Sequence, residues 1–206
     1  MLQKNTVEPS TFALLEELMN CSELNNFLLV GGTALSLHYG HRLSIDLDLF
    51  TTDEFDHEEL ISFLSTRFEG FQLLSNNKIG VFGFINDIKV DFVLHGFPLL
   101  NSPENIEGVR IASIPDIAAM KVNAVLKRAV KKDFWDISEL LQHYSIEDII
   151  GFYQTKFPSQ QLMISIPAAL TYFDDAEESP DPVSLKGQTW VSVKQIIQQK
   201  VREFLA

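Results

Sequence analysis

The chain has 206 residues, of which 46% are hydrophobic and 21% are charged. This composition argues against extended disorder and allows a core that needs no disulfide or structural metal. With 16 Lys and Arg against 28 Asp and Glu, the formal net charge is −12, which disfavours a general nucleic-acid coat protein. The single cysteine, Cys21, excludes an internal disulfide and a Cys-based zinc site, and it indicates a reducing compartment.

Nothing in the sequence indicates export or membrane insertion. The first ten residues lack the apolar core of a signal peptide. The longest apolar stretch, residues 27–37, is far too short to span a bilayer. We therefore expect a soluble cytoplasmic protein without a membrane partner.

In the first half of the chain, apolar patterns predict a mixture of helices and strands. Helical spacing follows Pro9, a helix start falls at Thr33, and Asp56 with Glu59 resembles a capping pair before another helix. Strands are predicted at residues 27–30, 44–50, 71–74, 80–85, 88–94 and 109–111. Turns at 75–78 and 86–87 make three of these strands a meander, and residues 98–108 are predicted to form a loop.

The second half of the chain is predicted to be nearly all helical. Ser113 begins a helix-start pattern, and helical spacing follows at roughly 115–130, 133–143, 146–156, 160–174 and 190–205. We place the boundary near residue 112. The fold class is therefore α+β, with domains at 1–112 and 113–206.

The strand at 44–50 carries two carboxylates on one face. Because side chains alternate along a strand, Asp46 and Asp48 share a face, while Ile45, Leu47 and Leu49 are expected to point into the core. Two like charges on one strand face destabilise a sheet unless a cation offsets them. A hard divalent cation such as Mg²⁺ is the simplest solution. The alternative is an ordinary solvated strand face.

Asp91 is a third candidate ligand. It lies on the polar face of a strand, opposite to Val90 and Phe92. If that strand neighbours the one with Asp46 and Asp48, three carboxylates converge, which is enough for a two-metal site.

The residues Gly31, Gly32 and Thr33 are candidates for a phosphate site. Glycines at a strand-to-helix turn let a phosphate approach the backbone, and a helix N-terminus favours anions. The Thr33 hydroxyl can add a hydrogen bond. Alone, two glycines indicate only a turn, but their order with the carboxylates is more specific.

A basic stripe is predicted on the helix at 115–130. Lys121, Arg128 and Lys132 fall on one side at 100° per residue, provided that one helix continues through Lys132. The stripe could face a polyphosphate, and the alternative is a solvated amphipathic face. His41 is expected to face nucleotide or solvent, and Arg42 to pair with Asp46 or Asp48 when metal is absent.

The order of these motifs is similar to that of polymerase-β-type nucleotidyltransferases. The longer sequence pattern, GGTAL and then GHR-x-S-x-DLDLF, resembles that of the AbiEii/AbiGii toxin family of nucleotidyltransferases. In the helical half, a Lys followed by Arg-x-x-x-Lys-Asp-x-x-Asp resembles the family's later motifs. The matching positions are Gly31–Leu35, Gly40–Arg42, Ser44, Asp46–Phe50, Lys121, Arg128, Lys132, Asp133 and Asp136.

The resemblance implies a nucleotidyltransferase-like mixed sheet in residues 1–112 and assigns roles to the later motifs. Lys121 would hold the nucleotide triphosphate, and Asp133 would orient a basic partner or assist catalysis. The alternative for Asp133 is a helix N-cap. Substrate binding is expected from the remaining motif positions, which are Gly31, Gly32, Thr33, Arg42, Ser44, Arg128, Lys132 and Asp136.

The reaction so implied is transfer of a nucleoside monophosphate from an NTP to an acceptor hydroxyl. Asp46, Asp48 and Asp91 would bind Mg²⁺ or Mn²⁺, and Asp91 would help to deprotonate the acceptor. The resemblance implies a toxin of a toxin–antitoxin or phage-defence pair, with tRNA or protein as acceptor and a cognate antitoxin as partner. Two alternatives stay open, a catalytically inactive binding module with this fold and a two-metal phosphodiesterase or nuclease.

Overall fold

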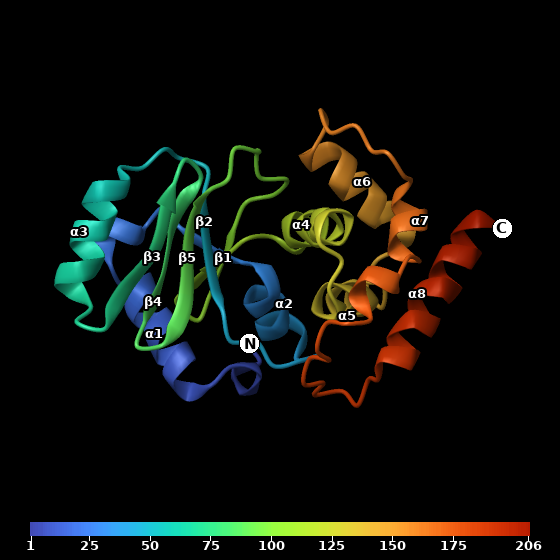
Figure 1. The fold of residues 1–206 in the computed structure, drawn as a ribbon, viewed down its shortest axis with the longest axis horizontal. Helices are drawn as coiled ribbons and strands as arrows, with labels where there is room; N and C mark the ends of the chain where they lie inside the picture. The colour runs from blue at the N-terminus through green and yellow to red at the C-terminus, as the bar shows by residue number, and fades with distance from the viewer.

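The computed structural model describes residues 1–206 as a mixed sheet beside a cluster of helices (Figure 1). The first half contains η1 (Lys4–Thr6), α1 (Pro9–Met19), η2 (Ser22–Leu24), β1 (Leu28–Val30), α2 (Gly31–Tyr39), β2 (Leu47–Thr51), α3 (His57–Arg67), β3 (Phe71–Asn77), β4 (Gly80–Ile85), β5 (Ile88–Leu94), β6 (Glu104–Ile106) and β7 (Val109–Ile111). The second half contains α4 (Ile114–Lys127), α5 (Lys131–Leu140), α6 (Ile146–Lys156), α7 (Ile166–Leu170), η3 (Asp174–Ala176) and α8 (Trp190–Leu205). The predicted α+β class is confirmed, and no strand follows Ile111.

The seven strands form one sheet in the order β3-β4-β5-β2-β1-β7-β6. The predicted meander β3-β4-β5 is antiparallel, β2 runs parallel to β5, and β1 runs antiparallel to β2. The two central strands β2 and β1 are therefore flanked by the strand that carries Asp91 and by the strand that leads into the helical half.

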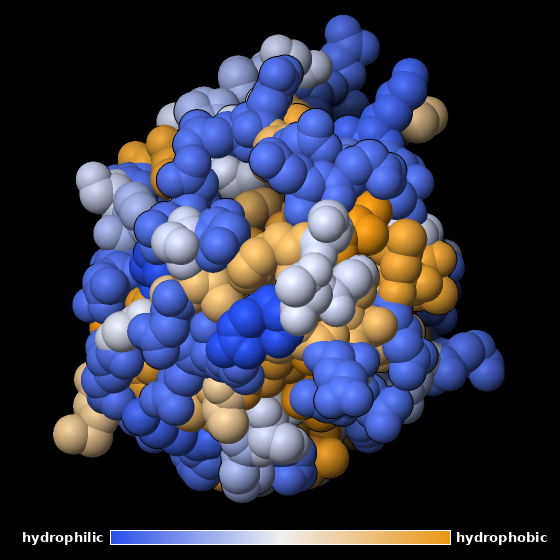
Figure 2. Space-filling view, turned by 90° about the vertical axis from the view of Figure 1, so that its left-hand side faces the viewer, coloured by the Kyte–Doolittle hydropathy of each residue, from blue (hydrophilic) through white to orange (hydrophobic).

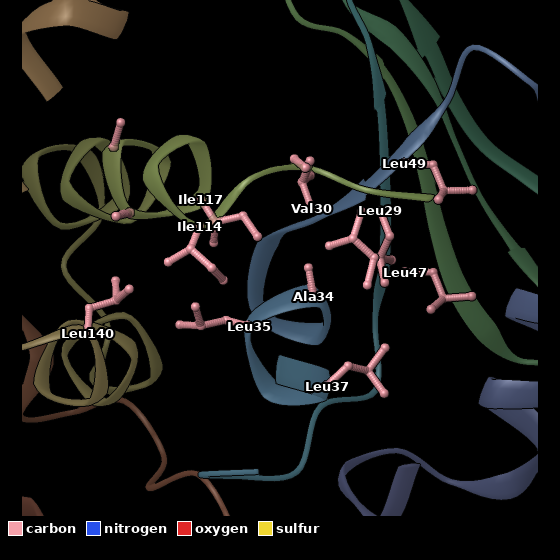
Figure 3. Close-up of a cluster of buried hydrophobic side chains, with 14 of the residues drawn as sticks. Leu29, Val30, Ala34, Leu35, Leu37, Leu47, Leu49, Ile114, Ile117 and Leu140 are labelled. Atoms are coloured by element: carbon pink, nitrogen blue, oxygen red, sulfur yellow. The ribbon is translucent and has the colours of Figure 1, made fainter. Parts of the chain in front are cut away.

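Helix α2 connects the sheet to the helical half. It packs on β1 and β2 on one side and on α4 and α5 on the other (Figure 1). Ala34, Leu35 and Leu37 are fully buried, and Leu35 points toward Ile114 and Ile117 of α4 (Figure 3). One hydrophobic cluster of 51 buried residues extends through both halves, so the division at residue 112 into two domains stays a prediction.

Capping residues set the ends of several helices as their sequences predict. The Asp56 side chain accepts from the Glu59 N–H at 3.0 Å, and Ser113 accepts from Asp116 N–H at 3.3 Å. A side-chain acceptor at these positions satisfies a backbone donor that has no partner within the helix.

Several predicted boundaries are wrong. The helix expected at 115–130 ends at Lys127, and Ala129, two residues later, adopts a left-handed backbone with φ 41°. The helix expected at 160–174 is reduced to α7, the turn expected at 75–78 is mostly strand β3, and the loop at 98–108 contains β6. Ile45 precedes β2 and is 65% exposed, so it does not point into the core.

A segment from the C-terminal half lies against the chain just before β2. Leu43 N–H donates to Val183 C=O at 2.9 Å, and Leu185 N–H donates to His41 C=O at 2.9 Å. Residues 183–185 therefore cover the connection between α2 and β2 from outside.

No helix is both long and apolar enough to cross a bilayer. The face that carries α3 and the sheet edge at β3 is largely hydrophilic, with apolar side chains showing between the polar ones (Figure 2). Leu73 and Leu74 of β3 are exposed.

Candidate active site

Asp48 and Asp91 lie side by side on two central strands. They are direct partners in the parallel register of β2 and β5. Their neighbours Leu47, Leu49 and Val90 are buried on the opposite face, which fixes the register because a slip by one residue would expose these apolar side chains. The sheet therefore holds two carboxylates next to each other.

The two carboxylates lack enough positive charge around them. Burial raises the pKa of Asp48, and the Asp91 charge raises it further, against the lowering effect of Lys121. Asp91 forms an ion pair with Lys89 through one oxygen, while its buried Oδ1 has no hydrogen-bond partner. An unpartnered buried carboxylate oxygen beside a second carboxylate fits a hard divalent cation.

Asp46 does not join this pair. It lies in the segment before β2, and its Oδ2 is 3.5 Å from Nζ of Lys132. No group of three or more His, Cys, Asp or Glu side chains is arranged to hold a metal ion. The expected convergence of Asp46, Asp48 and Asp91 is thus present only for the last two, and Asp46 must leave Lys132 to join them.

Gly31 is required where β1 meets α2. Its φ is 73°, in the left-handed region that favours glycine, and a Cβ at this position would overlap the Asp48 carboxylate. Because no residue separates strand from helix, the first backbone N–H groups of α2 lie beside Asp48. This places the anion-favouring end of the helix at the carboxylate pair.

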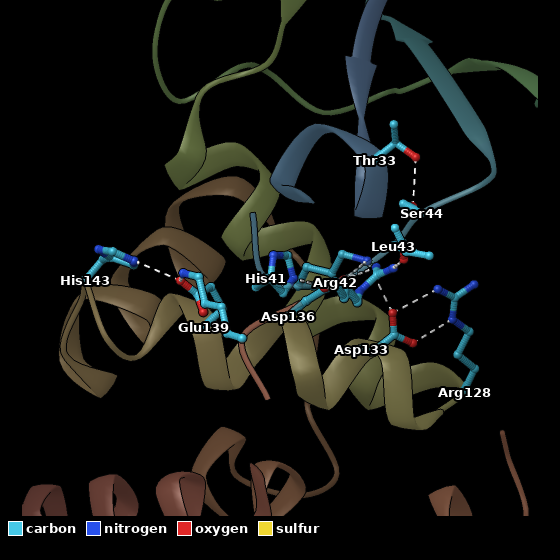
Figure 4. A network of polar contacts seen from close by, with 12 residues as sticks. Thr33, His41, Arg42, Leu43, Ser44, Arg128, Asp133, Asp136, Glu139 and His143 are labelled. Atoms are coloured by element: carbon cyan, nitrogen blue, oxygen red, sulfur yellow. Dashed lines mark hydrogen bonds and ion pairs between the residues drawn. The ribbon is translucent and has the colours of Figure 1, made fainter. Parts of the chain in front are cut away.

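Gly32 and Thr33 are in contact with other residues of the protein and not with open space. A Cβ on Gly32 would overlap the Arg42 guanidinium. Thr33 is 1% exposed, and its hydroxyl contacts Ser44 Oγ at 2.8 Å and the Asp46 C=O (Figure 4). The Thr33 and Ser44 hydroxyls therefore bind each other and fix the approach to β2, and their predicted role in phosphate binding stays a prediction.

Asp136 is the centre of a buried ionic network. Arg42 donates to its two oxygens at 2.7 and 2.8 Å, and His41 Nε2 lies 2.7 Å from Oδ1 (Figure 4). Lys121 Nζ lies 2.7 Å from Oδ2. Asp136 is fully buried. Burial alone raises its pKa, but Arg42, Lys121 and the His41 hydrogen bond hold that pKa well below its ordinary value. The network fastens the segment after α2 to α4 and α5.

Asp133 forms ion pairs with Arg128 and Lys121. Arg128 donates to both of its oxygens at 2.9 and 3.0 Å, and Lys121 Nζ is 3.4 Å away. Asp133 is the third residue of α5 and Val130 is the N-cap, so the alternative of a cap at Asp133 is wrong. The contact with Arg128 and Lys121 matches the idea that Asp133 orients a basic partner.

Three expectations about the basic groups are corrected. Lys121, Arg128 and Lys132 do not share a helix stripe, because α4 ends at Lys127 and α5 begins at Lys131. His41 is fully buried against Asp136 instead of facing nucleotide or solvent. Arg42 is 3% exposed and pairs with Asp136, not with Asp46 or Asp48.

Two cavities flank the carboxylates. The first, of about 300 Å³, runs along α4 and is lined by Val30, Gly31, Asp48, Phe50, His95, Met120, Lys121, Asn123, Ala124, Lys127, Arg128 and Phe157. The second, of about 420 Å³, is lined by residues 42–46, Val130, Lys132 and residues 179–183. Asp48 therefore faces the first cavity and Asp46 the second.

Sequence reasoning missed four residues of this site, namely Lys89, His95, Asn123 and Lys127. Lys89 could have been found, since it lies two residues before Asp91 and therefore on the same strand face. Asn123 and Lys127 lie four apart on one face of α4. His95 carried no signal, because its place follows from the β2–β5 pairing.

The mixed sheet, the carboxylate pair and the glycine turn at a helix N-terminus define a nucleotidyltransferase. The family model "Nucleotidyl transferase AbiEii toxin, Type IV TA system" matches residues 13–178. The chain therefore belongs to the AbiEii nucleotidyltransferase toxin family, as its sequence motifs predict. Nucleotidyltransferases of this kind use an NTP and a divalent metal.

Individual proteins are similar to this chain in sequence or in fold. An uncharacterized protein of Aquifex aeolicus strain VF5, aq_aa25, is 33% identical over 197 residues, covering 93% of this chain and 94% of its own. MenT4, a nucleotidyltransferase toxin of Mycobacterium tuberculosis H37Rv, is similar in structure with a TM-score of 0.57, 13% identity and coverage of 94% and 84%. JHP933 of Helicobacter pylori has a TM-score of 0.53, 16% identity and coverage of 97% and 95%.

Proposed function

We propose that this enzyme transfers a nucleoside monophosphate from an NTP to an acceptor hydroxyl with the aid of Mg²⁺. The observation that supports this most is the in-register pair of Asp48 and Asp91 beside the N-terminus of α2. This pair provides two carboxylates for a cation next to backbone donors for a phosphate. Asp46 becomes a third ligand when its side chain leaves Lys132.

In the reaction, the acceptor oxygen attacks the α-phosphorus and pyrophosphate leaves. A bound divalent cation would supply charge neutralisation at the phosphates and lower the pKa of the acceptor hydroxyl. Asp91, which would also hold the cation, helps to take up the hydroxyl proton, since its Oδ1 has no hydrogen-bond partner within the protein. Lys121, held by Asp133 and Asp136, faces the developing negative charge, and positioning of both substrates supplies most of the acceleration.

The two cavities suit the two substrates. We assign the cavity along α4 to the NTP. Gly31 places the N-terminus of α2 at this cavity, and the cations of Lys121, Lys127 and Arg128 line it as well. We assign the cavity beside Asp46 and Lys132 to the acceptor, because it opens on the other side of the carboxylates. Arg42, Ser44 and Asp136 support these cavities from within the protein.

The family suggests the biological setting. We propose that the protein acts in the cytoplasm as the toxin of a toxin–antitoxin or phage-defence pair, with a cognate antitoxin. The acceptor is the hydroxyl of a tRNA or of a protein. The net charge of −12 favours a short contact, such as the end of a tRNA, over a long nucleic-acid footprint.

Labelling with each of the four α-labelled NTPs tests this function. Total RNA and total protein are incubated with the enzyme, Mg²⁺ and one NTP at a time, beside the Asp46→Ala/Asp48→Ala variant. We expect metal-dependent label in one fraction, lost in the variant. An inactive binding module gives no label in either fraction, and a nuclease shortens RNA without any NTP.

A further inference from the structure

Two residues that line the cavity along α4 each carry a buried polar atom that has no partner in the protein. These atoms are Nε2 of His95 and Oδ1 of Asn123. A buried polar atom without a hydrogen bond costs free energy, so such atoms on residues that line one cavity indicate a ligand that satisfies them. Neither residue belongs to the motifs that identify the family.

His95 is suited to hydrogen bonding and not to charge pairing. Burial, together with the nearby positive charge of Lys156, lowers the pKa of His95 to about 4. At neutral pH its imidazole is therefore uncharged, with one ring nitrogen as donor and the other as acceptor. Such a group recognises the polar edge of a neutral partner, whereas phosphate would favour the cations at Lys127 and Arg128.

Aromatic rings surround His95. The ring centroid of Phe50 lies 5.6 Å from that of His95, that of Phe97 lies 5.5 Å away, and that of Phe157 lies 6.3 Å away. Phe50 and Phe157 also line the cavity. Aromatic walls with a few polar groups are the setting in which proteins stack and read nucleobases.

The aromatic end and the phosphate end are separated along the strands. Phe50 lies two residues after Asp48 on the same face of β2, about 7 Å further along, and His95 directly follows β5. On α4, Asn123 lies about one helical turn from both Met120 and Lys127, and all three line the cavity. The strands therefore place the aromatic rings around His95 beyond Asp48, and α4 adds Asn123 to the wall of the same cavity.

We propose that His95 and Asn123 select the base of the NTP by hydrogen bonds to its polar edge, while Phe50 and Phe157 hold its face. This inference rests on the proposed function, because it assigns the far end of the cavity that would hold the NTP. It makes base preference a property of two residues outside the catalytic motifs.

Calorimetric titration of His95→Phe and Asn123→Leu tests the proposal. Both variants keep the approximate shape of the side chain and remove its hydrogen bonds. The ligands are the four NTPs and inorganic tripolyphosphate, each with Mg²⁺, so the base-free ligand separates base recognition from phosphate binding. His57→Phe and Asn26→Leu, which lie outside the cavity, are the matched controls, and thermal unfolding confirms that each variant is folded. His95→Leu and Asn123→Ala, which also remove the hydrogen bonds, replace any variant that does not fold.

We expect the native enzyme to bind one NTP more tightly than the others and than tripolyphosphate. Each cavity variant should lower the affinity for that NTP about tenfold and leave tripolyphosphate binding within about twofold. An unchanged base preference, or an equal loss for NTP and tripolyphosphate, would overturn the proposal while the proposed function stands. If neither the NTPs nor tripolyphosphate bind the native enzyme, the proposed function fails as well.

Discussion

At the scale of single residues, the carboxylates of this protein fall into two groups with opposite surroundings. Asp136 is saturated by Arg42, His41 and Lys121. Asp48 and Asp91 adjoin each other with an excess of negative charge and an unpartnered oxygen. A saturated carboxylate holds structure together, whereas an unsaturated pair is available for a cation and a substrate.

Replacing Asp136 with Asn should destabilise the protein strongly. The change leaves Arg42 and Lys121 buried around a neutral amide, and removing one partner of a buried ion pair costs about 3–5 kcal/mol. The free energy of unfolding in urea measures this loss. Asp181→Asn is the matched control, because Asp181 pairs with Lys131 at the surface and is 58% exposed, and it should cost less than about 1 kcal/mol.

The stabilisation that Asp136 provides should depend on pH. A carboxyl whose pKa is depressed by folding stabilises the protein at pH values above its unfolded pKa, and this contribution is lost as the pH falls through the folded pKa. The folded pKa of Asp136 lies well below 3.8. The stability difference between native protein and Asp136→Asn should therefore narrow below about pH 4. A difference that stays constant from pH 6 to pH 2.5 would contradict this role.

At the scale of elements, the junction of β1 and α2 does the most to build the site. It brings the helix N-terminus against Asp48, and Gly31 makes this possible by its positive φ and its missing side chain. A longer turn would move the backbone donors of α2 away from the carboxylates.

Gly31→Ala should lower both stability and activity. The left-handed backbone and the overlap with Asp48 together should lower the free energy of unfolding by about 1–3 kcal/mol, and the displaced Asp48 should reduce the rate of nucleoside monophosphate transfer at least about tenfold. Gly151→Ala is the control, since Gly151 lies within α6 with open space around it, and there alanine should stabilise by about 0.5–1 kcal/mol. Equal effects of the two substitutions in unfolding and transfer assays would argue against a special role for Gly31.

Patterns with a local cause were predictable at this scale. Alternation identified β2 and β5, and caps identified the starts of α3 and α4, because these signals depend on neighbours in sequence. The burial of His41 and Arg42 was not predictable, since it depends on Asp136, more than ninety residues away. The break between the helices predicted at 115–130 and 133–143 was placed a few residues too late, because helical spacing continues past Lys127 while Ala129 adopts a left-handed backbone.

At the scale of the whole molecule, the sheet and the helical half are joined by α2, by the Asp136 network and by residues 183–185. The hydrophobic cluster is continuous across residue 112. The site draws Asp48 and Asp91 from the sheet half and Lys121, Lys127 and Arg128 from the helical half.

We therefore expect one cooperative unfolding transition. Trp135 and Trp190 lie in the helical half, so their fluorescence should change at the same urea concentration as far-ultraviolet circular dichroism, which reports on the whole chain. The fragment 1–112 should not fold alone, because Leu35 and its neighbours lose α4 and α5 as cover. Two separated transitions, or a folded fragment, would show instead that the halves are independent domains.

The most direct test of nucleoside monophosphate transfer follows the individual phosphates of the NTP. With the preferred NTP, Mg²⁺ and the acceptor fraction, we expect that an α-label is transferred and that a γ-label is released in pyrophosphate. The Asp48→Asn variant should abolish both. Transfer of the γ-label, or undiminished transfer by Asp48→Asn, would contradict nucleoside monophosphate transfer at the Asp48–Asp91 pair.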